Sequence, residues 1–260
     1  MNVSTQLELV AQKLDAARVE RRAVGQFDPP FDLDLAYAAQ AELIKLRLGR
    51  GERLMGLKMG FTSRAKMVQM GVNDLIWGRI TDAMMVEDGG TVAVSDYLHP
   101  RAEPEIAFLL SKPLKGRVTP LEALDAVAGI APAIEIIDSR YENFRFTHAE
   151  VVADNCSGAG FVVGPWSSPE ISTANLGMVM SVNGKPKHFA SSASLMGHPL
   201  RSLVAAARLV EQYGALGGEL EAGSVVLAGA GTPAVPIVPG QYVSVEVEQL
   251  GECGFLAVEA

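Results

Sequence analysis

Two glutamates in one predicted strand, Glu103 and Glu105, have the residue type and the spacing of a cation site. They lie at the start of the largely apolar run 103–110. Side chains at positions i and i+2 of a strand point to the same face, about 6–7 Å apart along the backbone. Like charges this close repel each other unless a positive charge lies between them. A divalent cation held by oxygen ligands would supply that charge, whereas a solvated strand face would leave both carboxylates in water.

A third glutamate, Glu135, lies within the apolar run 131–137. A carboxylate in such a strand is strongly disfavoured unless it is paired or bound to a metal. A salt bridge to a nearby arginine, such as Arg140, would satisfy it, and so would a shared cation. Together with Glu103 and Glu105 it makes an all-oxygen ligand set, which suits Mg²⁺ or Mn²⁺ and suits Zn²⁺ poorly.

Two further side chains are candidates for acid–base work. Lys58 lies between glycines and apolar residues in the run 56–60. It is either a solvated edge residue or a cation that projects into a cleft, where it could move protons or bind an anion. Asp74 is either a loop cap or a second acid–base group.

Two glycine-containing segments allow more than one interpretation. The polar, glycine-rich loop 154–160 could bind a carboxylate through its backbone N–H groups, or could simply turn the chain. The segment 229–231 resembles part of a dinucleotide-binding fingerprint. Because Pro233 and Pro236 follow it where that fingerprint needs a helix, we reject this interpretation.

Composition limits the class of protein. A hydrophobic content of 48% with 20% charged residues predicts a globular fold, and a net charge of −8 argues against nucleic acid as a partner. The two cysteines are too few for a disulfide framework, and the first residues lack the pattern of a signal peptide. No apolar run is long enough to cross a membrane. We therefore expect a cytoplasmic protein with no membrane partner.

Two regions are expected to position these side chains. Residues 1–51 predict a helical arm, in which an apolar stripe over 7–17 is followed by a second helix capped by Asp32 or Asp34. Residues 52–260 predict one catalytic α+β unit, with helices at 63–70, 119–128 and 199–213 and a hairpin turn at 183–184. Its strands are expected at 54–60, 103–110, 131–137, 161–163, 177–182, 224–227 and 242–247. Many strands with few helices between them favour a mixed sheet rolled on itself.

Four segments, in order along the chain, carry a resemblance to a known family: 56–63, 100–106, 132–140 and 152–155. They resemble the 2-keto-4-pentenoate hydratase and 4-oxalocrotonate decarboxylase group of the fumarylacetoacetate hydrolase superfamily, and the resemblance spans roughly residues 5 to 258. It implies the mixed β-roll of the fumarylacetoacetate hydrolase C-terminal type. It also implies a Mg²⁺ or Mn²⁺ site at Glu103, Glu105 and Glu135. Lys58 and Asp74 would be catalytic, and Lys58, Asn155 and Ser157 would contact substrate.

The segments 67–78, 136–141 and 228–236 look more like decarboxylases than hydratases, whereas the loop 156–160 lacks the serine-rich run expected of a decarboxylase. The resemblance thus implies metal-dependent loss of CO₂ from 2-oxo-3-hexenedioate, a small 2-oxo dicarboxylate of aromatic meta-cleavage, to give 2-hydroxypenta-2,4-dienoate. The alternatives are hydration of that dienoate and a non-catalytic partner subunit. A homo-oligomer and a complex with the vinylpyruvate hydratase are also implied.

Overall fold

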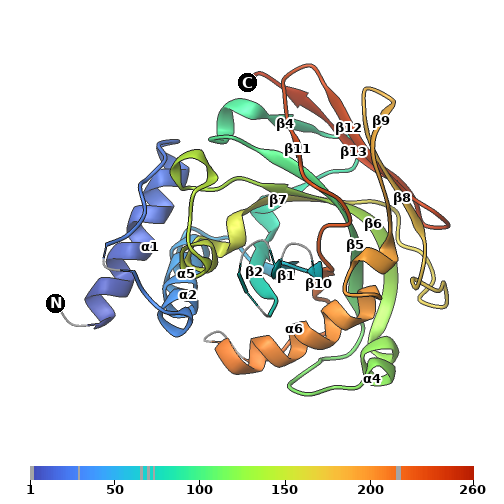
Figure 1. The fold of residues 1–260 in the computed structure, drawn as a ribbon, viewed down its shortest axis with the longest axis horizontal. Coiled ribbons are helices and arrows are strands. Elements are labelled where there is room, and N and C mark those ends of the chain that lie inside the picture. The colour runs from blue at the N-terminus through green and yellow to red at the C-terminus, as the bar shows by residue number, and fades with distance from the viewer. Residues whose placement is uncertain (1–2, 29, 65–66, 69–70, 73, 215–217) are drawn as a thin grey trace.

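The computed structural model describes residues 3–28, 30–64, 67–68, 71–72, 74–214 and 218–260. Two β-sheets form its centre and one side, and helices lie along the other sides (Figure 1). The larger sheet has the order β2-β1-β10-β5-β6-β7-β3, with β11 paired to β5. Its strands are β1 (Leu54–Gly60), β2 (Ile76–Thr81), β3 (Met85–Val86), β5 (Arg101–Leu110), β6 (Val127–Ile137), β7 (Gly158–Val163), β10 (Val225–Leu227) and β11 (Val235–Pro236).

The smaller sheet packs against the larger one and has the order β4-β13-β12-β8-β9. Its strands are β4 (Thr91–Ala93), β8 (Gly177–Val182), β9 (Lys185–Ser191), β12 (Tyr242–Val247) and β13 (Gly251–Val258). The hairpin between β8 and β9 turns at Asn183 and Gly184, both with positive φ. This is the backbone conformation that an Asn-Gly pair favours, so the predicted hairpin is confirmed.

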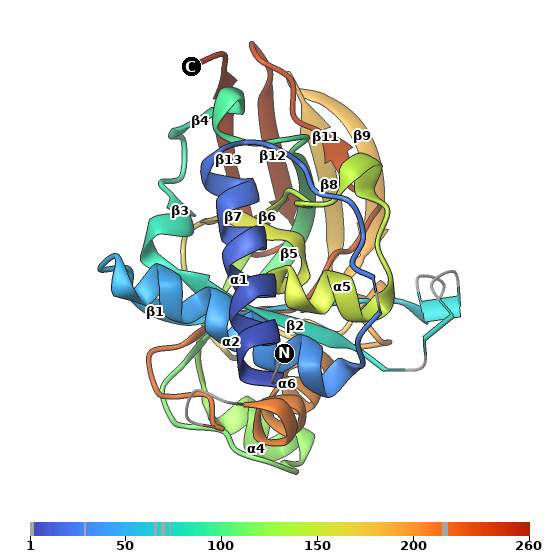
Figure 2. The ribbon, with the colours of Figure 1, turned by 90° about the vertical axis from the view of Figure 1, so that its left-hand side faces the viewer.

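Helices α1 (Val3–Val19) and α2 (Leu33–Gly49) form the N-terminal arm, which lies across one side of the strands (Figure 2). The side chain of Asp32 caps α2 by accepting the Leu35 N–H at 2.9 Å. The remaining helices are α4 (Pro120–Asp125), α5 (His148–Ala153) and α6 (Pro199–Tyr213). The fold is therefore α+β with a helical arm, as the sequence predicted. No helix among the described residues is long and apolar enough to cross a membrane.

Some expected boundaries were wrong. Helix α4 has the predicted capping box at Thr119 but ends at Asp125, because β6 begins two residues later. Strands β2 and β13 were not predicted, since each contains glycine and a charged residue among its apolar positions. The helix expected over 63–70 lies largely outside the described residues.

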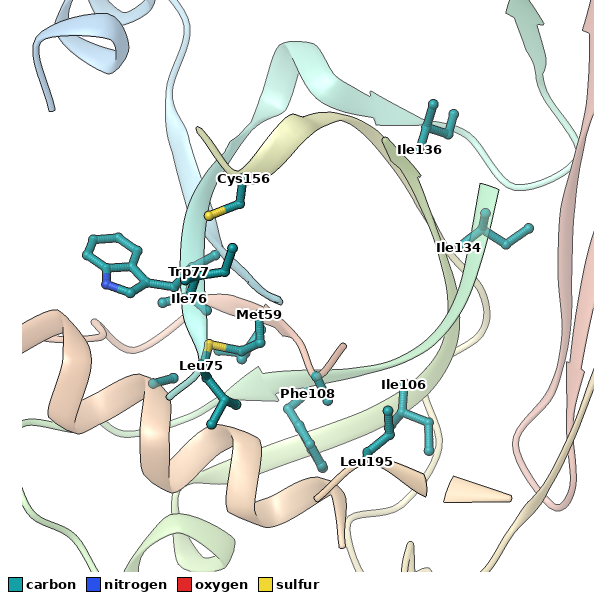
Figure 3. Packing of buried hydrophobic residues seen from close by; sticks show 14 of the residues in the cluster. Met59, Leu75, Ile76, Trp77, Ile106, Phe108, Ile134, Ile136, Cys156 and Leu195 are labelled. Atoms are coloured by element: carbon teal, nitrogen blue, oxygen red, sulfur yellow. The ribbon is translucent and has the colours of Figure 1, made fainter. Parts of the chain in front are cut away.

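The larger sheet curls, and its two faces carry different side chains. Cα-paired residues in neighbouring strands point to the same face. The pairs Glu103–Glu135 and Lys58–Leu227 therefore place polar side chains on the inner face. That face also carries a small apolar cluster: Ile80, Met84, Ala107, Ala131, Ala133, Phe161, Val225 and Leu227. On the outer face Trp77, Ile106 and Ile134 point away from the curl into the main core (Figure 3).

Candidate metal centre and active site

Three glutamates meet on the inner face of the curled sheet. Glu103 pairs with Glu135 across β5 and β6, and Glu105 follows on the same face of β5. One carboxylate oxygen from each lies within 4.8 Å of the other two. Their exposed fractions are 8% for Glu103, 0% for Glu105 and 1% for Glu135. The two strands thus bring together the three acids that the sequence singled out.

The oxygen atoms of this cluster fit a divalent cation. Glu105 Oε2 accepts the Gly229 N–H at 2.7 Å, but Glu105 Oε1 and Glu135 Oε2 are buried and have no hydrogen-bond partner among the described residues. Burial, together with the neighbouring Glu135, raises the pKa of Glu105 well above its usual value. Burial also raises the pKa of Glu135 to about 7, although Lys58 opposes it. Buried carboxylate oxygens without donors are the ligands that Mg²⁺ and Mn²⁺ prefer.

Lys58 supplies positive charge beside these acids. It is 3% exposed, and its Nζ lies 2.8 Å from Glu135 Oε1 and donates to the Cys156 carbonyl at 3.1 Å. Burial lowers the pKa of Lys58, but Glu135 and the other nearby acids outweigh burial and hold the pKa above its usual value. Lys58 is therefore a buried cation and not a solvated edge residue.

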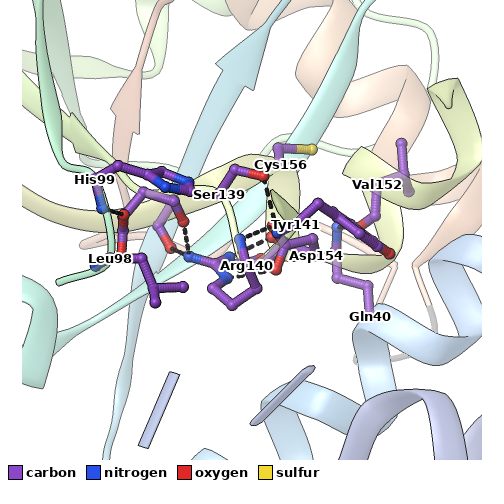
Figure 4. A network of polar contacts seen from close by, with 12 residues as sticks. Gln40, Leu98, His99, Ser139, Arg140, Tyr141, Val152, Asp154 and Cys156 are labelled. Carbon is purple, nitrogen blue, oxygen red and sulfur yellow. Dashed lines mark hydrogen bonds and ion pairs between the residues drawn. The ribbon is translucent and has the colours of Figure 1, made fainter. Parts of the chain in front are cut away.

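Arg140 does not pair with Glu135, so that alternative was wrong. Its Nε donates to the Asp154 carboxylate (Figure 4). Its Nη1 donates to the Gly158 carbonyl at 3.3 Å. Arg140 and Asp154 are 3% and 0% exposed. This buried pair joins the end of β6 to the loop before β7, and so fixes the position of the loop beside Glu135.

That loop, the 3-10 turn Asn155–Ser157, has three consecutive residues with left-handed φ of 49°, 53° and 58°. The Asn155 side chain accepts the Arg79 N–H at 2.7 Å and donates to the Arg79 carbonyl at 2.8 Å. These two hydrogen bonds hold the loop against β2, and the Cys156 carbonyl then points toward Lys58. A Cβ on Gly78 would lie 2.5 Å from the Asn155 carbonyl oxygen, so only glycine allows this approach.

The other expected site residues lie in different settings. Ser157 is 4% exposed, and its Oγ has no hydrogen-bond partner in the described part of the chain. Asp74 pairs with Arg208 of α6 at 2.8 Å and accepts the Leu75 N–H at 2.8 Å. Its side chain is 44% exposed, and among the described residues it makes no hydrogen bond or ion pair with the three glutamates.

Two backbone groups complete the site and were missed at the sequence level. One is the Cys156 carbonyl that accepts from Lys58, and the other is the Gly229 N–H that donates to Glu105. Gly229 has a φ of 106°, and a Cβ there would lie 2.1 Å from Thr62 Oγ1. The first glycine of the segment that resembled a dinucleotide fingerprint thus donates to a carboxylate. A backbone group leaves no signal in residue type, although a glycine between strands hints at a close approach.

Comparisons with known proteins agree with this geometry. Residues 55–255 match the fumarylacetoacetate (FAA) hydrolase C-terminal family. A protein of Pseudomonas sp. named 4-oxalocrotonate decarboxylase is 54% identical over 95% of this chain and 96% of its own length. A 2-hydroxyhexa-2,4-dienoate hydratase of Comamonas testosteroni is 35% identical over 89% of this chain and 88% of its own length.

A solved structure resembles the whole chain. It is a 4-oxalocrotonate decarboxylase from Pseudomonas putida G7, complexed with magnesium and adipate. The TM-score is 0.95 and the identity 34%, and 99% of each chain is covered. The similarity therefore includes the N-terminal helices, which lie outside the range matched by the family.

Proposed function

Because the chain belongs to the fumarylacetoacetate hydrolase family, we propose that it is a metal-dependent decarboxylase of 2-oxo-3-hexenedioate (4-oxalocrotonate). The product is 2-hydroxypenta-2,4-dienoate, as in the meta-cleavage of aromatic compounds. The observation that carries the proposal is the 54% identity, over 95% of the chain, to a protein of that name. The three clustered glutamates supply a site that suits this chemistry.

Glu103, Glu105 and Glu135 would hold Mg²⁺ or Mn²⁺. When bound there, such a cation supplies Lewis acidity and positive charge to the 2-oxo acid end of a substrate. The similar decarboxylase with magnesium also holds adipate, a six-carbon dicarboxylate like the proposed substrate.

Lys58 would stabilise the charge that develops during the reaction. Breaking the C5–C6 bond releases CO₂ and leaves an electron pair, which spreads through the C3–C4 double bond to the 2-oxo oxygen. Protonation of that oxygen gives the dienol. An ammonium group fixed beside this oxygen stabilises the transition state more than the substrate, because the negative charge grows as the bond breaks. The contacts of Lys58 with the Glu135 carboxylate and the Cys156 carbonyl, which fix its ammonium beside the three glutamates, support this role.

Three other side chains have proposed roles. The Ser157 hydroxyl, which is buried without a partner among the described residues, would donate to a substrate oxygen. Asn155 would contribute to substrate binding by fixing the loop that carries Ser157. Asp74 would act in proton transfer only after leaving Arg208, with which it pairs here.

The assembly is also part of the proposal. We expect a cytoplasmic homo-oligomer that acts on a small 2-oxo dicarboxylate and associates with the vinylpyruvate hydratase that consumes its product. Both cysteines are buried and free, which suits a reducing compartment. Co-purification of the separately tagged decarboxylase and hydratase tests the association.

A direct assay separates decarboxylation from hydration, the function of the Comamonas testosteroni relative. The purified protein with Mg²⁺ is given 2-oxo-3-hexenedioate, and CO₂ release is measured. In a parallel reaction it is given the dienoate, and loss of the dienol absorbance is followed. We expect CO₂ release and little direct hydration.

Two variants test the acidic site in the same assay. Glu105→Gln should abolish CO₂ release, because the neutral amide removes a charged oxygen ligand. Glu246→Gln, an exposed change on β12, is the matched control and should retain the wild-type rate. Rapid hydration without CO₂ release would reject the decarboxylase, and an unchanged rate in Glu105→Gln would reject the metal site.

A further inference from the structure

Arg79 of β2 is a buried cation without a counter-charge among the residues that the structure describes. Its side chain is part of a residue only 7% exposed, and its Nε is fully buried with no hydrogen-bond partner. No hydrogen bond or ion pair joins its guanidinium to any residue that the structure describes. The guanidinium lies over the ring of Trp77, whose centroid is 4.7 Å from Cζ.

Burying the Arg79 guanidinium in this way costs desolvation free energy. Buried charges in proteins are normally paired and hydrogen-bonded, yet the fully buried Nε of Arg79 donates to no acceptor among the described residues. Burial alone lowers the pKa of Arg79 to about 10, and no acid raises it in return. A cation-π contact with Trp77 offsets only part of the desolvation.

Arg79 lines a cavity of about 510 Å³ on the outer face of the larger sheet, beneath α6. This volume falls within the range of about 300–1,000 Å³ that is typical of small-molecule sites. The apolar part of the lining comes from β1, β3, α6 and the segment before β10: Leu54, Met55, Leu57, Met85, Val210, Leu220 and Ala222.

The acids near this cavity do not neutralise Arg79. Asp82 pairs with the exposed Arg53 at 2.8 Å. Glu219 and Glu221 line the rim, yet neither contacts Arg79 among the interactions described. The cavity therefore combines apolar walls, one unpaired guanidinium and a weakly acidic rim. Such a rim disfavours ligands that carry several negative charges.

We propose that this cavity binds a small organic carboxylate, whose anionic end pairs with Arg79 and whose apolar body lies against Leu57, Val210 and Leu220. A guanidinium and a carboxylate form two parallel hydrogen bonds, which would satisfy donors that now have no acceptor. The site is separate from the three glutamates, because Arg79 pairs with Leu57 in the strand register and Lys58 pairs with Gly78. The two cations therefore lie on opposite faces of β1 and β2.

A carboxylate bound at Arg79 would affect the position of Lys58 in the candidate active site. The Arg79 N–H donates to the Asn155 side chain, and the Arg79 carbonyl accepts from it. The carbonyl of the next residue, Cys156, accepts from Lys58. Arg79 in the cavity is thus connected to Lys58 in the candidate active site through Asn155 and Cys156.

Calorimetric titration with benzoate tests the proposal, using the intact protein after chelation so that a bound metal cannot hold the probe. Benzoate should bind saturably, and Arg79→Met should weaken binding by at least about tenfold, since hydrogen bonds to a charged group are lost. Benzamide, which has the same shape without the charge, should bind more weakly by a similar factor. Arg22→Met, which removes an exposed arginine of the N-terminal arm away from the cavity lining, is the matched control and should bind benzoate as the wild type does.

Two further measurements exclude unfolding of the variant and binding of benzoate at the three glutamates as explanations. Circular dichroism of Arg79→Met should match the wild type, so that a loss of binding is not a loss of fold. Glu105→Gln should still bind benzoate, whether or not the proposed decarboxylation is correct. The proposal is overturned if benzoate fails to bind the wild type, or if Arg79→Met binds it equally well. It is also overturned if Arg79→Met dissociates the oligomer, because the cavity then belongs to an interface between copies.

Discussion

Lys58 and Arg79 are two buried cations on paired strands, and they differ in what surrounds them. Their residues are 3% and 7% exposed, and their side chains point to opposite faces of the same pair of strands. Lys58 faces three carboxylates, which hold its pKa above the usual value even though burial opposes them. Arg79 faces none close enough to act, and burial lowers its pKa to about 10.

The comparison shows that burial alone does not decide what a charged residue does. On the inner face, β5 and β6 supply more negative charge than Lys58 can balance, so the site needs a further cation. On the outer face, α6 and the segment before β10 supply apolar walls, so Arg79 needs an anion. Changes at the two cations should therefore have opposite consequences.

The largest effect should come from Lys58→Met. It leaves Glu135 buried without its partner, and breaking a buried pair in this way costs about 3–5 kcal/mol. Denaturant unfolding of the metal-free protein measures this loss, and CO₂ release should fall with it. Lys45→Met removes an exposed lysine paired with Glu42 and should cost no more than about 0.5 kcal/mol. Equal losses in the two variants would contradict the account of the inner face.

Asn155→Ala should have the next largest effect. It removes two hydrogen bonds and leaves the buried N–H and carbonyl of Arg79 without partners, at a cost of about 2–3 kcal/mol. The Cys156 carbonyl would then no longer be fixed near Lys58, so kcat should fall while the affinity for Mg²⁺ is kept. A loss of stability with an unchanged kcat would show that Asn155 has only a structural role.

The pH dependence of metal binding should be smaller but has a definite sign. The pKa of Glu135 is raised from 4.5 to about 7, so the fold favours its protonated form. In the metal-free protein this contribution to stability is present below pH 4.5 and is lost as pH rises through 7. A cation needs the deprotonated form, and its affinity should therefore rise with pH by about 1 kcal/mol per unit below pH 7. Calorimetric titration with Mg²⁺ from pH 5.5 to 8 measures this, and a flat profile would contradict it.

The smallest effect on stability should come from Arg79→Met. Because the guanidinium has no counter-charge in the described part of the chain, an apolar side chain of similar length should cost nothing and could add up to about 1 kcal/mol. Thermal unfolding in the absence of carboxylate buffers compares the variant with the wild type. A loss of 3 kcal/mol or more, like that expected for Lys58→Met, would mean that Arg79 has a partner after all.

The sequence predicted more of the site on the inner face of the larger sheet than of the cavity on its outer face. The spacing of Glu103 and Glu105 and the apolar surroundings of Glu135 were local signals, and they predicted the acidic cluster. Glu103 and Glu135 lie directly across from each other only because of the register of β5 and β6, and no short sequence pattern encodes that register. The same is true of Lys58, which reaches Glu135 only because β1, β10, β5 and β6 are neighbours in the sheet.

Arg79 gave no signal at all. In the segment Ile76–Thr81 a single arginine among apolar residues looks like an exposed position, yet the Trp77 ring lies against it and Val210 of α6 lines the same cavity. The sequence also suggested Arg140 for Glu135, because the two are close along the chain. The fold instead pairs Arg140 with Asp154, which follows it after the short helix α5. Long-range pairing, rather than residue type, was the missing information.

The most direct test of the central claim is the release of CO₂ from 2-oxo-3-hexenedioate by exhaustively chelated protein that is then titrated with Mg²⁺. The acidic cluster has room for one cation among oxygens that lie within 4.8 Å of one another. The account predicts no CO₂ release from the chelated protein and a return of activity that saturates at one Mg²⁺ per chain. Full activity after chelation would contradict it.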